Sequence, residues 1–198
     1  MKLLIALIML TTTTIVSAQS RLVTIDAYDF SYTGGLLIKS DNGKNDDREK
    51  TTFRLNLNYA QNWEKYVGVM WRARVFINRD SVDFGSNDTL ETSWGGSGGL
   101  IYNFNPDNLK ESYFASASLG LERATYEVGS SDDESGFNLF GDLEGGKRFD
   151  LGQYSVANVS YAPSITLTLK RYGGDIRDTY YKNGTELKLN FLKFDILF

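Results

Sequence analysis

The sequence of 198 residues contains no cysteine, no histidine and only two prolines. Without cysteine the chain has no disulfide bond, no thiolate metal ligand and no attachment point for a lipoprotein anchor. Without histidine it lacks the side chain whose ordinary pKa lies nearest neutrality, which is the commonest general base in enzymes. The formal charge is mildly negative, −4, and this argues against a nucleic-acid partner because such proteins present a basic face.

An unbroken apolar run occurs at residues 3–10, after a positive start at residues 1–2 and before compact residues at 16–18. This is the layout of a cleavable signal peptide, and the run is too short for a transmembrane helix, which needs about 20 apolar residues. We predict a signal peptide over residues 1–18 and a single domain over residues 19–198. Removing the signal peptide takes away one lysine and no acid, so the formal charge becomes −5.

Aromatic residues and glycine are plentiful, with 12 Tyr, 12 Phe, 3 Trp and 19 Gly. This composition favours strands and turns, and about eight segments alternate in polarity like a strand with one apolar face. In the clearest segment, residues 67–78, the apolar positions are Val67, Val69, Trp71, Ala73, Val75 and Ile77. The first segment changes phase near residues 27–28, and Pro163 removes a backbone donor within another segment, so we expect a bulge at each place.

The connections between these segments differ in length. We predict long connections over residues 34–50, 79–90, 128–136 and 172–185, and short ones over residues 61–65, 105–110 and 148–152. These connections join eight antiparallel strands, with the first and last strand ends on the side of the short turns. The sequence therefore predicts an all-β fold, an eight-stranded antiparallel up-and-down barrel.

The polar face of each segment distinguishes a soluble barrel from a transmembrane one. A soluble barrel of the lipocalin kind has apolar side chains inside and charges outside. Here the polar face is rich in Ser, Gly and Asn, which fit the narrow interior of an eight-stranded barrel, and it carries few charges. We therefore expect a transmembrane β-barrel whose apolar face contacts lipid.

The last segment ends in a row of large apolar side chains at every second position, Leu192, Phe194, Ile196 and Phe198. This row resembles the C-terminal assembly signal of bacterial outer-membrane β-barrel proteins. The chain after residue 18 resembles the small eight-stranded superfamily that includes the OmpA transmembrane domain, OmpX and OmpW. The resemblance implies a bacterial outer-membrane location, contact with outer-membrane lipid and lipopolysaccharide, and recognition by the outer-membrane assembly machinery. We expect a monomer with no cofactor and no metal.

If the apolar face meets lipid, the charged side chains of the polar face point into a bore only just wide enough for side chains. Unpaired buried charges are costly, so opposite charges must pair there. We expect Arg72 and Arg74 to be neutralised by at least two of three acids on other strands. The candidate lumen residues are Arg54, Arg72, Arg74, Glu122, Asp142 and Glu144. Three roles stay open for this set: a salt-bridge network that plugs the lumen, a gate or narrow ion path, and a catalytic carboxylate site.

We expect a structural or surface-interaction protein with a side-chain-filled lumen. The alternative is a narrow channel for ions or small solutes. A lipid-modifying enzyme is a third hypothesis, and the absence of histidine argues against it, because the resemblance implies that barrel enzymes use histidine in their catalytic sets. Arg171, Arg177 and Lys182 lie near tyrosines in one predicted loop, where they are candidates for contact with lipopolysaccharide phosphates or sugars.

Overall fold

The structure is a computed structural model, and it describes residues 21–26, 29–33, 48–83, 88–128, 134–155, 157–174 and 183–198. The predicted signal peptide, residues 1–18, lies outside the described residues. So do the rim candidates Arg177 and Lys182 and most of the predicted connection over residues 34–50.

The described chain consists of twelve strands and one short 3-10 helix. The elements are β1 (Arg21–Asp26), β2 (Asp29–Thr33), β3 (Arg48–Asn62), β4 (Val69–Asp83), β5 (Asp88–Asn103), η1 (Leu109–Glu111), β6 (Tyr113–Val128), β7 (Glu134–Lys147), β8 (Phe149–Tyr154), β9 (Ala157–Tyr161), β10 (Ser164–Arg171), β11 (Asn183–Asn190) and β12 (Lys193–Leu197). In the part of the chain that is described, no helix is long and apolar enough to cross a membrane.

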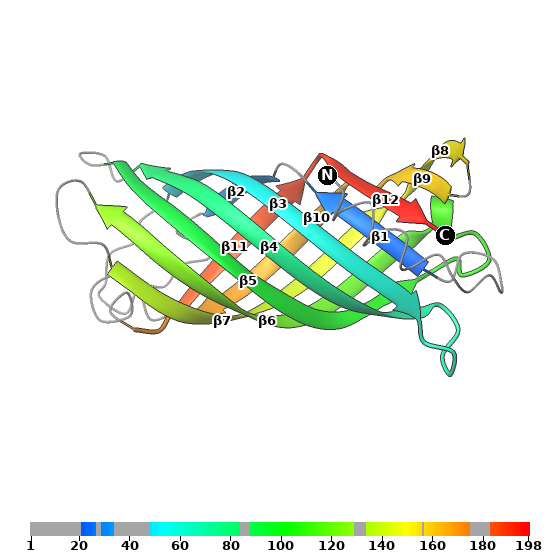
Figure 1. Ribbon diagram of the computed structural model, residues 1–198, viewed down its shortest axis with the longest axis horizontal. Coiled ribbons are helices and arrows are strands. Elements are labelled where there is room, and N and C mark those ends of the chain that lie inside the picture. The colour runs from blue at the N-terminus through cyan, green and yellow to red at the C-terminus, as the bar shows by residue number, and fades with distance from the viewer. Residues whose placement is uncertain are drawn as a thin grey trace.

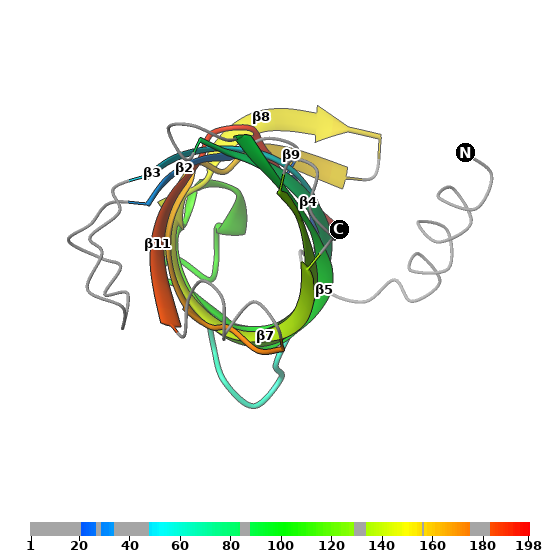
Figure 2. The same cartoon turned by 90° about the vertical axis from the view of Figure 1, so that its left-hand side faces the viewer.

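The strands close into an antiparallel ring of eight (Figure 2). The order around the ring is β2, β11, β10, β7, β6, β5, β4 and β3, and β3 pairs again with β2. Toward one end of the barrel β2 lies between β3 and β11, and toward the other end β1 lies between β3 and β12. Figure 1 shows the strands tilted against the long axis of the barrel. The predicted eight-stranded antiparallel up-and-down barrel is confirmed.

Three of the eight long strands are interrupted at residues that the structure describes. The interruption at Ala162-Pro163 lies where the sequence predicts a bulge, whereas the bulge predicted near residues 27–28 lies outside the described residues. Two further interruptions, at Arg148 and at Phe191-Leu192, are not predicted. Phe191 and Leu192 are both exposed, so the alternation slips by one residue there, as in a β-bulge.

The outer surface of the ring is a belt of aliphatic side chains. Leu119 is 72% exposed and Val75 is 61% exposed, whereas the residues beside them in each strand are buried or half-buried. The exposed aliphatic side chains of the belt are Leu55, Val75, Ile77, Leu119, Leu121, Leu139, Leu143, Ile165 and Leu169. This is the reverse of a soluble barrel, in which apolar side chains fill the interior.

Two predicted connections are wrong. Residues 149–154 form β8, and the turn to β9 lies at residues 155–156, so the short connection predicted over residues 148–152 is misplaced. The ladder between β4 and β5 continues to the pair Asp83 and Asp88, so the long connection predicted over residues 79–90 shrinks to residues 84–87. Backbone pairing does not require apolar side chains, and the ladder therefore runs on past the end of the apolar row.

The two ends of the barrel differ. We call the end with the connections at residues 63–68 and 104–112 the turn end, and the opposite end the loop end. At the turn end, the Phe198 N–H donates to the Arg21 carbonyl at 2.9 Å and joins the first and last long strands. The hairpin of β8 and β9 leaves the ring at this end (Figures 1 and 2).

Candidate functional site in the barrel lumen

The charged side chains inside the barrel are balanced in sign. Among the described side chains, six basic and six acidic ones are buried or nearly buried. The basic ones are Arg72, Arg74, Arg148, Lys170, Lys188 and Lys193. The acidic ones are Glu91, Glu122, Asp142, Glu144, Glu186 and Asp195. Equal numbers of opposite charges allow each to be compensated, which matters because a lone buried ion is strongly destabilising.

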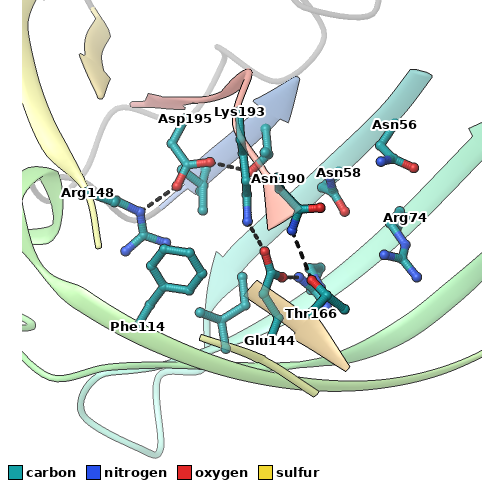
Figure 3. A pocket seen from close by; sticks show the side chains of 14 residues that line it. Asn56, Asn58, Arg74, Phe114, Glu144, Arg148, Thr166, Asn190, Lys193 and Asp195 are labelled. Atoms are coloured by element: carbon teal, nitrogen blue, oxygen red, sulfur yellow. Dashed lines mark hydrogen bonds and ion pairs between the residues drawn. The ribbon is translucent and has the colours of Figure 1, made fainter. Parts of the chain in front are cut away.

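Glu144 on β7 is shared by two cations (Figure 3). Its Oε2 accepts a hydrogen bond from Arg72 Nη1 at 2.7 Å, and its Oε1 forms an ion pair with Lys193 Nζ. Ser164 Oγ donates to Oε1 at 2.7 Å, and Ser116 Oγ donates to Oε2 at 3.2 Å. The structure thus brings two predicted lumen residues together and adds Lys193, which is absent from the predicted set.

A second ion pair joins Arg74 Nη2 to Asp142 Oδ2. Thr168 Oγ1 donates to the other carboxylate oxygen of Asp142 at 2.6 Å. The guanidinium of Arg74 lies 5.4 Å from the ring centroid of Phe76 and 5.6 Å from that of Phe140. Aromatic rings therefore cover the cation while the carboxylate neutralises it.

The third predicted acid, Glu122, takes a lysine as its partner. Lys170 Nζ lies 2.5 Å from Glu122 Oε1, and Asn138 Nδ2 donates to the same oxygen at 2.9 Å. Toward the same end of the lumen, Lys188 Nζ lies 3.1 Å from Glu186 Oε2. Arg54 is the remaining predicted lumen residue, and its side chain lies outside the described part of the structure.

The largest fully buried side chain described is Arg148, which the sequence analysis misses. Arg148 Nε donates to Asp195 Oδ2 at 2.5 Å, and its Nη1 donates to Asn103 Oδ1 at 2.6 Å. Thr24 Oγ1 donates to the other oxygen of Asp195 at 2.6 Å. The sequence contains a signal for this pair, because Asp195 alternates with the outward Phe194 and must therefore point inward, where it needs a cation.

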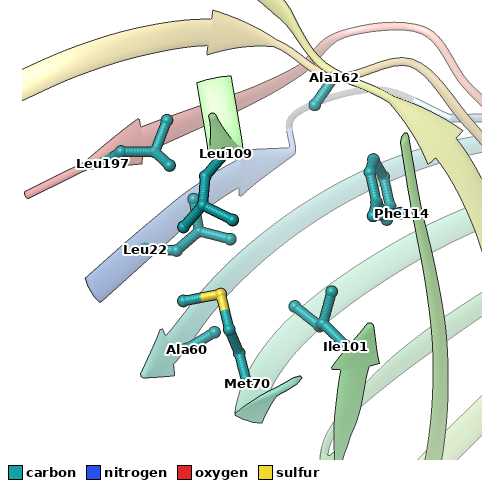
Figure 4. Packing of buried hydrophobic residues seen from close by; sticks show 8 residues of the cluster. All are labelled: Leu22, Ala60, Met70, Ile101, Leu109, Phe114, Ala162 and Leu197. Atoms are coloured by element: carbon teal, nitrogen blue, oxygen red, sulfur yellow. The ribbon is translucent and has the colours of Figure 1, made fainter. Parts of the chain in front are cut away.

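Apolar side chains close the lumen at the turn end (Figure 4). The cluster, which we call the apolar plug, consists of Leu22, Ala60, Met70, Ile101, Leu109, Phe114, Ala162 and Leu197. Leu109 belongs to η1, so the connection over residues 104–112 folds back into the bore. The predicted inward face is rich in Ser, Gly and Asn, and an apolar cluster at the turn end was not predicted.

Phe114 is the member of the apolar plug that contacts the cations of the ion pairs. Its ring centroid lies 4.6 Å from the Arg148 guanidinium and 4.6 Å from Lys193 Nζ. Like the two other inward phenylalanines, it stands directly opposite a glycine of the next strand. The opposed pairs are Phe76 with Gly95, Phe114 with Gly146, and Phe140 with Gly120. A Cβ on Gly120 would lie 2.4 Å from Phe140 Cζ, so glycine leaves the room that the ring fills.

The free space among the described lumen residues is small. Two cavities among the described lumen residues have volumes of about 20 Å³ and about 10 Å³. The larger lies beside Arg72, Glu144 and Lys193 (Figure 3), and it is the size of roughly one buried water molecule. Neither cavity is large enough to hold a hydrated ion.

One ion pair lies outside the bore, at the turn end. Lys110 Nζ is 2.7 Å from Asp150 Oδ2, and the Gly152 N–H donates to Asp150 Oδ1 at 2.8 Å. The hydrogen bond from Lys110 lowers the pKa of the Asp150 carboxyl, with help from the Gly152 N–H. The same hydrogen bond raises the pKa of Lys110. The pair ties η1, and with it Leu109 of the apolar plug, to β8.

The predicted assembly row lies on the outward face of the ring. Leu192 and Phe194 are exposed, and Ile196 and Phe198 are half-buried, whereas the side chains of Asp195 and Leu197 are buried in the lumen. The structure thus places all four predicted residues on the surface of the last long strand.

A closed ring of eight antiparallel strands, aliphatic outside and ion-paired inside, is the fold of the small outer-membrane β-barrel proteins. A comparison with solved structures agrees. Neisserial surface protein A, NspA, superimposes with a TM-score of 0.53 at 16% sequence identity, over 92% of this chain and 98% of that chain. This likeness shows the fold.

Two other solved structures match with TM-scores below 0.5 and add nothing to the assignment. The translocator domain of the autotransporter NalP from Neisseria meningitidis has a TM-score of 0.37 at 12% identity, over 95% of this chain and 64% of that chain. The outer membrane protein OprG from Pseudomonas aeruginosa has a TM-score of 0.34 at 12% identity, over 90% and 93%. No protein-family model and no curated protein matches the sequence.

Proposed function

We propose that this chain is an integral protein of the bacterial outer membrane, with a structural or surface-interaction role, no enzymatic activity and a monomeric state. The aliphatic belt supports contact with lipid, because soluble proteins rarely expose contiguous apolar surface of this extent. In this proposal the turn end faces the periplasm and the loop end faces the outside, as is general for barrels of this fold.

The observation that carries the structural role is the filled lumen. From the loop end to the turn end, the described bore contains the pair Glu122 with Lys170, then Asp142 with Arg74, then the contacts of Glu144. Beyond them lie the Arg148 pair and the apolar plug. Ion pairs neutralise the charges that an ion path would use, and the apolar plug adds a second barrier beside them.

Planar-bilayer recording tests the closed lumen. The purified barrel, shown to be folded by a mobility on SDS gels that changes on boiling, is expected to give no discrete conductance steps. Steps in the unmodified protein would instead favour the narrow channel. In that case Glu144→Gln should change the ion selectivity if the path runs through the bore, whereas the outward Leu119→Ala should leave it unchanged.

The outward row of Leu192, Phe194, Ile196 and Phe198 supports a second part of the proposal. We infer that the outer-membrane assembly machinery recognises this row on the last strand of the barrel. The row is exposed or half-buried along the strand, so its side chains are accessible to a binding partner. Outer-membrane lipid and lipopolysaccharide are the proposed surroundings of the finished barrel.

A further inference from the structure

Arginine follows the aliphatic row on three strands of the outer surface. On β4, β6 and β10, the last exposed aliphatic residue is Ile77, Leu121 or Leu169. Two residues further toward the loop end, on the same outward face, each strand has an exposed arginine. We call Arg79, Arg123 and Arg171 the arginine belt.

The strand register keeps the belt at one height on the barrel. Arg79 pairs with Thr92, and Thr92 pairs with Thr125 of β6. Arg123 is therefore displaced from the position that is in register with Arg79 by two residues toward the turn end. Arg171 is displaced from Arg123 in the same direction and by the same two residues, across β7. Strands tilt in a closed barrel, and a constant displacement from strand to strand is what holds residues at one height.

The belt has an uncompensated positive charge. None of the three arginines forms an ion pair with a residue that the structure describes. The acids toward the loop end whose side chains are described, Glu91, Glu122 and Glu186, are buried in the lumen. The lipid-facing surface at this level is therefore basic among the described side chains.

Aromatic side chains place the belt at the boundary of the apolar layer. Trp94 is 56% exposed and stands directly opposite Arg123 on the neighbouring strand. Phe137, which is 65% exposed, stands opposite Arg123 on the other side, with its ring centroid 5.8 Å from the guanidinium. Tryptophan beside cations is typical of the membrane interface, where lipid headgroups begin.

We propose that the arginine belt binds the phosphate groups of membrane-lipid headgroups in the leaflet at the loop end. This inference rests on the proposed function, since it requires a barrel embedded in lipid. A guanidinium offers parallel N–H donors that match two phosphate oxygens. Arg123 and Arg171 flank β7, about 12 Å apart from two strand spacings and a displacement of two residues, so neighbouring headgroups or one headgroup with two phosphates can span them.

Local lipid enrichment tests the belt, with Trp94 as reporter. The chain has three tryptophans, and Trp63→Phe with Trp71→Phe leaves only the one beside Arg123. The full barrel is reconstituted in phosphatidylcholine vesicles that contain, at the same low mole fraction, either brominated phosphatidic acid or brominated phosphatidylcholine. Phosphatidic acid is expected to be enriched at Trp94 by about five-fold per arginine contact, and so to quench its fluorescence more strongly.

Replacing all three belt arginines by glutamine is expected to abolish the difference between the two lipids at Trp94. A reporter at the other end of the barrel, Trp71 in a Trp63→Phe, Trp94→Phe background, should show the same ratio of quenching with and without the belt. The corresponding lysine variant keeps the charge, so it is expected to keep part of the preference; it replaces the glutamine variant should the latter fail to fold.

Three outcomes would overturn the inference, and they differ from one another. Equal quenching of Trp94 by the two lipids in the unmodified belt means that the belt selects no phosphate headgroup. A preference for phosphatidic acid that persists in the glutamine variant means that groups other than the belt arginines hold this lipid. No quenching of either Trp94 or Trp71 by either lipid means that the barrel is not in the bilayer, and then the proposed function fails as well.

Discussion

Replacement of Glu144 by leucine leaves two cations without their shared anion. Glu144 accepts a hydrogen bond from Arg72 and is also paired with Lys193, and both cations are buried. Replacement of Arg72 by methionine is a milder change, because the carboxylate keeps Lys193, Ser164 and Ser116. The geometry therefore predicts that the two single substitutions have unequal effects on the free energy of unfolding.

The expected loss of unfolding free energy for each substitution follows from the distance between the charges and from their burial. At the 2.7 Å separation of Arg72 and Glu144, Coulomb attraction with an effective dielectric constant of about 20 is about 6 kcal/mol. The side chains are only 5% and 6% exposed, so desolvation offsets much of this attraction. Removing Glu144 exposes that desolvation penalty and should cost about 3–5 kcal/mol. Removing Arg72 should cost about 1–3 kcal/mol, because it leaves a satisfied carboxylate with fewer donors.

The double variant gives the decisive comparison. Arg72→Met should destabilise the unmodified barrel but stabilise the Glu144→Leu barrel, because in that background it removes one of the two unpaired cations. The assay is reversible urea unfolding in detergent micelles, followed by tryptophan fluorescence. Arg74→Met is the matched control: it lies two residues away on β4 and has its own partner, Asp142, so its effect should change much less on removal of Glu144. An equal cost of Arg72→Met in both backgrounds would refute the coupling of this pair.

Three further predictions concern other parts of the barrel. Gly120→Ala should cost roughly 1–3 kcal/mol of unfolding free energy by overpacking, since the added Cβ meets a phenylalanine ring at 2.4 Å; Gly145→Ala, with nothing within 4 Å of its Cβ, should be close to neutral in the same unfolding assay. The pKa of Asp150 is lowered in the folded state, so its contribution to stability is present above the unfolded value near pH 4 and is lost as the pH falls further. The difference in urea midpoint between the unmodified chain and Asp150→Asn should accordingly be seen near neutral pH and vanish in acid, whereas a pH-independent difference would exclude the pair with Lys110 as its cause. Phe198→Ser should lower the amount of folded barrel in the outer membrane of cells without preventing refolding of the purified chain in micelles; an unchanged cellular amount would argue against recognition of the assembly row.

The alternation of side chains was readable from the sequence because it is a local property of a strand. Every second residue of β4 and β6 faces outward as predicted, for example Val75 on β4 and Leu119 on β6. Successive side chains of a strand point to opposite faces of the sheet. Pro163 was readable for the same reason: it cannot donate to the ladder, and β9 ends two residues before it. Polar residues 79–83 were misread as a loop because the end of the apolar row was taken for the end of the strand.

The partners of the lumen charges depend on closure of the barrel. The sequence places Arg72, Glu122 and Glu144 on the inward face, but it does not say that Glu144 meets Arg72 whereas Glu122 meets Lys170. Those pairings depend on the stagger between strands and on which strands face one another across the bore. Arg148 was missed because its position between β7 and β8 has no alternation to follow.

Antiparallel strands with one apolar and one polar face, their closure into a barrel of eight, and the outward direction of the apolar face could all be predicted from the sequence. This was possible because polarity with a period of two is written residue by residue along each strand. Three features became visible in the folded barrel alone: Leu109 packs into the apolar plug from a turn, Glu144 is shared by two cations, and Arg79, Arg123 and Arg171 lie at one height. Each of these depends on distances between residues far apart in the chain, and those distances exist only once the ring has closed with a particular register.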